Sequence, residues 1–161
     1  MTTIVKGQGI KAIDPSKDWS LPAFLAAGSA VADRYRVLIT GAPDKAREID
    51  AALNAHGDDR LVNLAGQLSL TEFAALVKRA RLMLTGDSFP MHVAGACGTP
   101  VIALFGPTDE SRVGPRDSHS RVLRAPGCQQ CDRANCARRC LDRISVDTVV
   151  ASIHKLEGEA F

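Results

Sequence analysis

One stretch in the middle of the chain, residues 81–108, constrains the fold most strongly. An apolar run ends at Gly86, Pro90 opens a short helix of small residues that Gly98 stops, and a second apolar run follows. This order predicts strand, turn, helix and strand. In a parallel sheet, the loop after a strand faces the ligand crevice, and a helix that begins there directs backbone N–H groups at anions. We therefore expect three polar residues of this unit to lie where a nucleotide would bind: Asp87, Ser88 and His92.

The segments on either side repeat the alternation of strand and helix. Short apolar runs predict strands at 36–40 and 61–65 and an outer strand at 121–124. Helices are expected at 22–33 after Ser20, at 44–55 before Gly57, after the capping box of Ser69 and Glu72, and after Ser145. Alternation with short connections favours a parallel sheet covered by helices. The predicted fold class is α/β, a Rossmann-like, doubly wound parallel sheet with helices on both faces, in a single domain at 1–161.

The first 15 residues carry the weakest pattern. Lys6, Gly7 and Gly9 interrupt any strand, and the alternation at 10–13 is slight. We expect no strand there and interpret the opening as a truncated start.

Composition narrows the class of partner. A chain of 161 residues, 45% of them hydrophobic, is long enough for one domain with a core. A formal net charge of +2 and an aromatic content of 4% argue against a nucleic-acid partner. No apolar run is long enough for a membrane span, and the first residues lack the hydrophobic region of a signal peptide. We expect a cytoplasmic protein.

Four cysteines gather in a charged loop at 126–143: Cys128, Cys131, Cys136 and Cys140. Four closely spaced thiolates suit a structural Zn²⁺, and a reducing cytoplasm favours a metal over disulfides. Their spacing differs from the paired Cys-x2-Cys of zinc ribbons. Three states remain open: free or redox-variable thiols, which we favour, a structural zinc site, and, well behind these, an iron–sulfur cluster.

Residues 66–115 resemble the nucleotide-sugar half of family 9 glycosyltransferases, the ADP-heptose:lipopolysaccharide heptosyltransferases. Four motifs in order carry the resemblance: Leu64-Ala65-Gly66, Asp87-Ser88-Phe89-Pro90-Met91-His92-Val93-Ala94, Gly98-Thr99-Pro100 and Phe105-Gly106-Pro107-Thr108. A looser similarity extends it to Ser16-Lys17-Asp18-Trp19 and Thr40-Gly41-Ala42-Pro43-Asp44.

The resemblance implies one half of a two-domain (GT-B) transferase. This chain matches the C-terminal, donor-binding half, and the N-terminal acceptor domain that carries the general base has no counterpart in it. The whole enzyme would transfer heptose from ADP-heptose or a related donor to a lipopolysaccharide-core acceptor, with inversion, no required cofactor, and a place at the inner membrane face. Alone, the chain is expected to bind nucleotide, turn over poorly, and self-associate through the uncovered face. The alternative is a non-catalytic nucleotide-binding module or sensor.

The expected donor site combines a positive charge from Lys17, a hydrogen bond from Ser16 and the helix start at Ser88 and Phe89. The resemblance adds two donor-binding residues, Asp87 and His92. We expect Asp44 or Glu48 to accept a hydrogen bond from a ribose hydroxyl.

Each of these residues also has a purely structural interpretation. Asp87 and Ser88 can be helix caps, Asp44 and Glu48 can be first-turn acids, and Lys17 can be a solvated lysine. Where the family usually has glycine, this chain has Phe89, whose ring narrows or blocks the approach of a phosphate.

Overall fold

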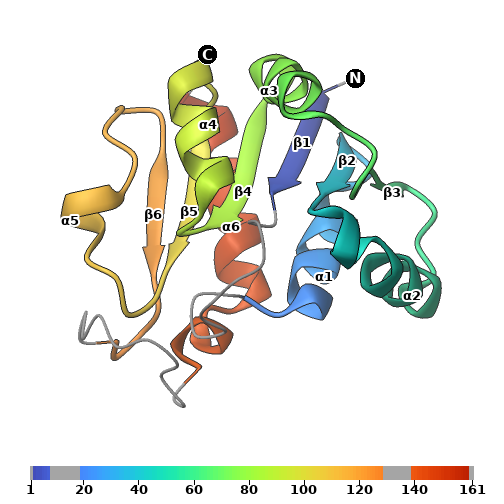
Figure 1. The fold of residues 1–161 in the computed structure, drawn as a ribbon. Helices are drawn as coiled ribbons and strands as arrows, with labels where there is room; N and C mark the ends of the chain where they lie inside the picture. Colours follow the sequence, from blue (N-terminus) through green and yellow to red (C-terminus); the bar gives the residue numbers. More distant parts are fainter. Residues whose placement is uncertain (1, 8–18, 129–138, 160–161) are drawn as a thin grey trace.

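The computed structural model describes residues 2–7, 19–128 and 139–159. Six strands form one parallel sheet in the order β3-β2-β1-β4-β5-β6 (Figure 1). The strands are β1 (Thr2–Gly7), β2 (Tyr35–Thr40), β3 (Leu61–Asn63), β4 (Leu82–Gly86), β5 (Val101–Phe105) and β6 (Arg121–Arg124). From β1 the chain runs outward to β3 on one side and to β6 on the other, as in a doubly wound fold. The predicted fold class is confirmed.

Within the described residues, six α-helices and two 3-10 turns lie between and after the strands. The helices are α1 (Leu21–Val31), α2 (Ala46–His56), α3 (Leu70–Arg79), α4 (Phe89–Cys97), α5 (Glu110–Val113) and α6 (Val146–Glu159). The 3-10 turns are η2 (Pro43–Lys45) and η3 (Cys140–Arg143). No helix within the described ranges is both long and apolar enough to cross a membrane.

Strand β1 contradicts the expectation that the opening residues form no strand. Ile4 lies opposite Val37 of β2 on one side and Leu82 of β4 on the other, so β1 sits inside the sheet. Gly7 is the last residue of the strand, where it ends the pairing and does not interrupt it. Pairing on two sides is a long-range effect that a weak local pattern does not reveal.

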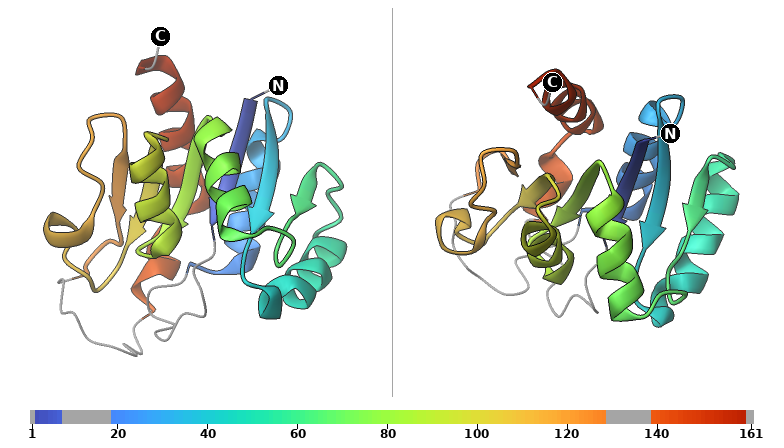
Figure 2. Two further views of the ribbon diagram at one scale, coloured as in Figure 1. Left: turned by 45° about the horizontal axis from the view of Figure 1, so that its top comes forward. Right: turned by 90° about the horizontal axis from the view of Figure 1, so that it is seen from above.

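The helices divide between the two faces of the sheet (Figure 2). One core cluster joins α1, α2 and α6 to alternate strand residues, among them Leu82, Leu84 and Ile102. The other joins α3 and α4 to the residues that point the opposite way, among them Met83 and Phe105. This alternation is the two-residue period of a strand buried on both faces, which explains why the strands read as continuous apolar runs.

Local signals set the ends of the helices as predicted. The Ser20 side chain accepts from Ala23 N–H at the start of α1. Ser69 and Glu72 form the predicted capping box of α3. Left-handed glycines, Gly57 and Gly98, end α2 and α4 with φ of 74° and 70°, a conformation that glycine adopts without steric cost.

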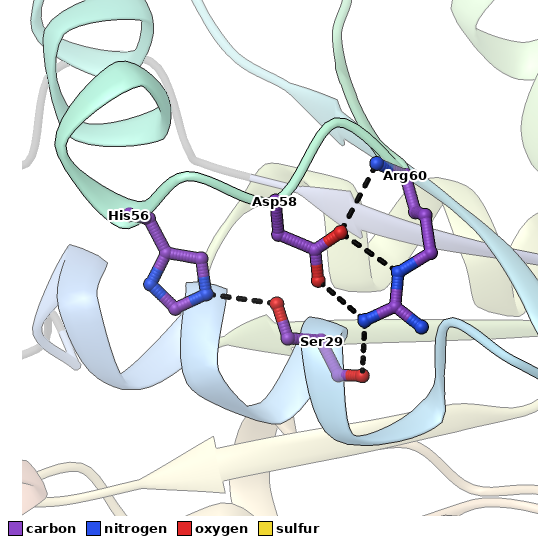
Figure 3. A network of polar contacts seen from close by, with 4 residues as sticks. All are labelled: Ser29, His56, Asp58 and Arg60. Atoms are coloured by element: carbon purple, nitrogen blue, oxygen red, sulfur yellow. Dashed lines mark hydrogen bonds and ion pairs between the residues drawn. The ribbon is translucent and has the colours of Figure 1, made fainter.

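A polar network ties α1 to the segment before β3 (Figure 3). The Ser29 hydroxyl lies 2.8 Å from His56 Nε2, and the Arg60 guanidinium donates to both Asp58 carboxylate oxygens at 2.8 and 2.7 Å. Arg60 also donates to the Ser29 carbonyl at 3.4 Å. The network lies where β3 begins, at the amino-terminal edge of the sheet. Its role is to hold α1, α2 and β3 together.

We expect the Asp58→Asn variant to lose an acid-sensitive part of the chain's stability. Hydrogen bonds from the Arg60 guanidinium, followed by one from Ser29, hold the pKa of Asp58 well below its usual range. A carboxyl whose pKa is lower in the folded state stabilises the fold above its unfolded pKa, and this contribution is lost as pH falls through the folded value. Thermal unfolding at pH 7 and pH 3 should show a larger gap between wild type and variant at pH 7. The exposed neighbour supplies the control, Asp59→Asn, and an equal gap at both pH values would contradict the assignment.

Candidate functional site

A crevice opens at the carboxyl-terminal edge of the sheet, between the turn after β2 and the start of α4. Its walls come from residues 40–43 after β2, from Leu64, Gly66, 68–70 and Phe73 around the start of α3, and from Phe89 and Pro90 at the start of α4. We call it the switch-point crevice, because β1 lies between β2 and β4, where the direction of strand order reverses. The volume is about 340 Å³. Open α/β sheets bind ligands at this position.

The walls of the switch-point crevice are mainly apolar. Among the described residues, two large hydrophobic side chains are exposed to solvent: Leu70, with 63% of its surface exposed, and Phe89, with 42%. Both line the crevice. Half-buried Leu68 and Phe73 continue the wall. An apolar slot with two phenylalanine rings in its lining suits a flat ring.

Gly66 holds two walls of the crevice together. Its N–H donates to the Gly41 carbonyl at 3.0 Å, which joins the turn after β3 to the turn after β2. Its φ is 71°, and a Cβ atom there would lie 2.8 Å from the backbone Cα of Pro43. Both the conformation and the space require glycine. In the sequence, Gly66 is only the last residue of the Leu64-Ala65-Gly66 motif, and nothing local reveals its contact with Pro43.

The start of α4 forms the other side of the crevice. Ser88 occupies the N-cap position, but its side chain accepts no hydrogen bond from the helix. The Ser88 hydroxyl instead lies 3.1 Å from Thr85 Oγ1 and donates to the Gly86 carbonyl at 3.4 Å. The capping interpretation of this side chain is therefore wrong. Pro90 has no N–H and the Met91 N–H donates to the Ser88 carbonyl at 3.0 Å. Among the first three residues of α4, the N–H of Phe89 is therefore the one left for an anionic ligand.

The structure does not bring all the predicted donor-site residues together. Asp87 and Ser88 lie at the turn into α4 and Phe89 lines the crevice. Asp44 lies in η2 and Glu48 in the first turn of α2; both are exposed and neither lines the crevice. The Glu48 carboxylate accepts from Lys45 Nζ at 2.7 Å. Ser16 and Lys17 lie outside the described residues.

His92 lines a second hollow, between α4 and α5. This α4–α5 hollow has a volume of about 440 Å³ and is lined from α4 by Met91, His92 and Gly95, and from α5 and the loop after it by residues 112–117. It shares no lining residue with the switch-point crevice. Within α4, therefore, Phe89 lines the switch-point crevice and His92 lines the α4–α5 hollow.

An arginine that the sequence analysis missed fixes the loop after β5. Arg124, at the end of β6, donates to the carbonyls of Gly106 and Thr108 at 2.9 and 3.0 Å and forms an ion pair with Glu110. The Arg124 guanidinium thus joins β6 to the loop after β5 and to the start of α5. A planar guanidinium has several N–H donors and can bond to several acceptors at once. In the sequence, Arg124 is only a basic residue on an outer strand.

Two of the four clustered cysteines fall in the described part of the chain. Cys140 is buried in the larger core cluster and Cys128 packs against that cluster. Cys131 and Cys136 lie outside the described residues, so the four-thiolate zinc site stays a prediction, to be checked by metal analysis of the purified chain. Trp19, the last residue of the Ser16-Lys17-Asp18-Trp19 motif, is buried in the larger core cluster and donates from Nε1 to the Ile144 carbonyl at 3.0 Å.

Comparison with known proteins decides the family. The model of glycosyltransferase family 9 (heptosyltransferase) matches residues 10–141. The chain belongs to this family. It is 29% identical over 153 residues to lipopolysaccharide heptosyltransferase 2 of Salmonella typhimurium, a match that covers 90% of this chain and 44% of the relative. It is 37% identical over 113 residues to lipopolysaccharide heptosyltransferase 3 of Escherichia coli, covering 64% and 33%.

Solved structures of the family share the fold. The E. coli ADP-heptose lipopolysaccharide heptosyltransferase II superposes with a TM-score of 0.80 at 26% identity, covering 96% of this chain and 46% of that one. A family 9 member from Veillonella parvula gives a TM-score of 0.78 at 24% identity, covering 98% and 47%. The chain therefore spans about half the length of these family 9 enzymes.

Proposed function

We propose that this chain is the C-terminal, donor-binding domain of a heptosyltransferase-type enzyme of lipopolysaccharide-core biosynthesis, acting on ADP-heptose or a related donor. The observation that carries the proposal is the switch-point crevice, an apolar slot beside the uncapped start of α4. Membership of family 9 supports the sugar-transfer chemistry. The E. coli relative named for ADP-heptose supports the choice of donor.

Different parts of the crevice bind different parts of the nucleotide sugar. The apolar walls, including Phe89 and Leu68, contact the base, and the Phe89 N–H at the start of α4 donates to the diphosphate. Because negative charge grows on the diphosphate as the glycosidic bond breaks, this N–H group and Lys17 stabilise the transition state. Ser16 adds a hydrogen bond, and Asp87 accepts from a sugar hydroxyl, since its charge would repel a phosphate. Asp44 or Glu48 accepts from the ribose at the edge of the site.

Transfer requires a second half. The general base and the binding site for the acceptor's reacting hydroxyl are assigned to an acceptor-binding domain. No catalytic base is therefore assigned within this chain, and we expect weak or no turnover by the chain alone. The alternative is a nucleotide sensor, and the same crevice would serve it. Transfer activity after mixing with an acceptor half separates the two functions.

Calorimetric titration with ADP, UDP and GDP tests the donor site. We expect ADP to bind most tightly, and Lys17→Ala to weaken ADP binding by about tenfold, the value of one charge-assisted contact. The control is Lys155→Ala, an exposed lysine on α6, which should bind ADP like the wild type. Absence of binding to every nucleotide would contradict both the transferase and the sensor.

Substitution of Phe89 tests whether its ring contacts the nucleotide base or blocks the phosphate. Because its half-exposed ring stands on the wall, we expect it to contact the base and not to block the phosphate. Phe89→Ala should weaken ADP binding by about fivefold, the lower range for loss of a stacking surface. Leu70→Ala removes an aliphatic side chain from the same crevice and should have a smaller effect. Tighter binding by Phe89→Ala would show that the ring obstructs the site.

A further inference from the structure

The α4–α5 hollow carries an excess of positive charge. Two arginines, Arg112 and Arg116, line it from one side, against one carboxylate, that of Asp117, and the His92 ring lines it from the other side. Asp117 already accepts from the N–H of His119 and from the Ser120 hydroxyl, both at 2.9 Å. Asp117 keeps its negative charge, so the two arginines leave the lining of the hollow with one positive charge in excess.

The two arginines keep most of their donors for a ligand. Among the described residues, the Arg112 guanidinium makes no hydrogen bond or ion pair, and Arg116 makes one hydrogen bond, from Nη2 to the Arg112 carbonyl at 3.3 Å. The nearby acid on the chain, Asp109, is occupied as the cap of α5, where it accepts from Ser111 N–H at 2.9 Å. Guanidinium groups bind phosphate and carboxylate through paired N–H donors.

The wall that carries the arginines is held in place. Arg124 pairs with Glu110 at the start of α5, and the Gly114 N–H donates to the Glu110 carbonyl at 2.8 Å. A Cβ atom on Gly114 would lie 2.6 Å from that carbonyl oxygen, so the turn after α5 closes tightly. Arg112 and Arg116 are thereby presented on a fixed segment, which reduces the entropy lost when a ligand is bound.

We propose that the α4–α5 hollow binds an anionic group, a phosphate or a carboxylate, carried by the saccharide acceptor. This inference rests on the proposed function, because the switch-point crevice is assigned to the nucleotide and shares no lining residue with the hollow. An acceptor must approach the donor sugar near the start of α4, and His92 lies one helical turn beyond Phe89. The hollow then holds the anionic part of the acceptor next to the reacting sugar.

The test is an amide NMR titration of the full chain, saturated with ADP, using glucose 6-phosphate, glucuronate and glucose as probes. We expect one or both anionic sugars to shift the signals of residues 91–95 and 112–117, and glucose to leave them unchanged. The anionic sugar that gives the larger shift identifies the preferred group. No shifts, or equal shifts with glucose, would overturn the proposal.

Substitutions locate the binding. Arg112→Gln combined with Arg116→Gln should weaken binding of the anionic sugar by about tenfold, as two exposed charge contacts are lost, and leave ADP affinity unchanged. The matched control is Arg47→Gln, an exposed arginine on α2, which should bind like the wild type. Loss of ADP binding in the double variant, or displacement of the sugar by ADP, would assign the hollow to the donor and overturn the proposal. If ADP fails to bind the wild type while the anionic sugars still shift these signals, the proposed function falls and the anion site stands.

Discussion

Gly66→Ala should weaken ADP binding by at least about tenfold and destabilise the chain by about 2–3 kcal/mol. A side chain at φ 71° costs conformational energy, and its Cβ would lie 2.8 Å from the Pro43 backbone. Relief of that contact must separate the turns that the Gly66 to Gly41 hydrogen bond joins. Because both turns line the switch-point crevice, its shape changes together with the stability.

A second glycine, Gly57, distinguishes the effect of backbone strain on stability from the effect of a changed crevice shape on ADP binding. Gly57 has a φ of 74° but no atom within 4 Å of the position a Cβ would occupy. It ends α2 far from the crevice. Gly57→Ala should therefore cost about 1 kcal/mol and leave ADP affinity unchanged. Equal effects of the two substitutions on ADP binding, measured by calorimetry with stability from urea unfolding, would contradict the role of Gly66.

Arg124→Met should destabilise the chain by about 2 kcal/mol, since two backbone carbonyls and one carboxylate lose a charged donor. The Gly106 carbonyl belongs to a buried residue and the arginine is itself partly buried, so water replaces these bonds incompletely. The loop after β5 and the start of α5 would loosen together, and the affinity of the α4–α5 hollow for anionic sugars should fall as well.

A double-mutant cycle isolates the contribution of the ion pair. Glu110→Gln alone, Arg124→Met alone and the double variant should show non-additive losses in urea unfolding, because the two residues interact directly. Arg36→Met, at an exposed arginine of β2, is the control and should change stability by less than about 0.5 kcal/mol. Additive losses in the cycle would show that the ion pair does not couple the two elements.

The central unit could be predicted because its signals are local. Pro90 opens α4, Gly98 ends it in the left-handed conformation, and the apolar runs before and after it become β4 and β5. Strand β1 could not be predicted in this way, since its stability comes from neighbours more than 30 residues away, such as Val37 opposite Ile4. Local patterns report caps and turns well and long-range pairing poorly.

The candidate site was only partly predictable for the same reason. The sequence placed Phe89 and His92 in one site, because both follow β4, but the structure assigns them to different hollows. Leu68 and Leu70 flank the predicted cap residue Ser69, and no sequence signal indicates that they line the crevice. Arg124 acts on a loop 14 to 18 residues before it in the chain. Each of these relations depends on how distant segments meet.

An amide NMR titration of the chain with ADP tests whether the switch-point crevice is the nucleotide site. We expect the signals of Gly41, Gly66 and Phe89, around the switch-point crevice, to shift together and saturate with one dissociation constant. Signals of Ser29 and Asp58, at the opposite edge of the sheet, should stay unchanged. Shifts confined to residues 112–117, or no shifts at saturating ADP, would contradict the assignment of the crevice as the nucleotide site.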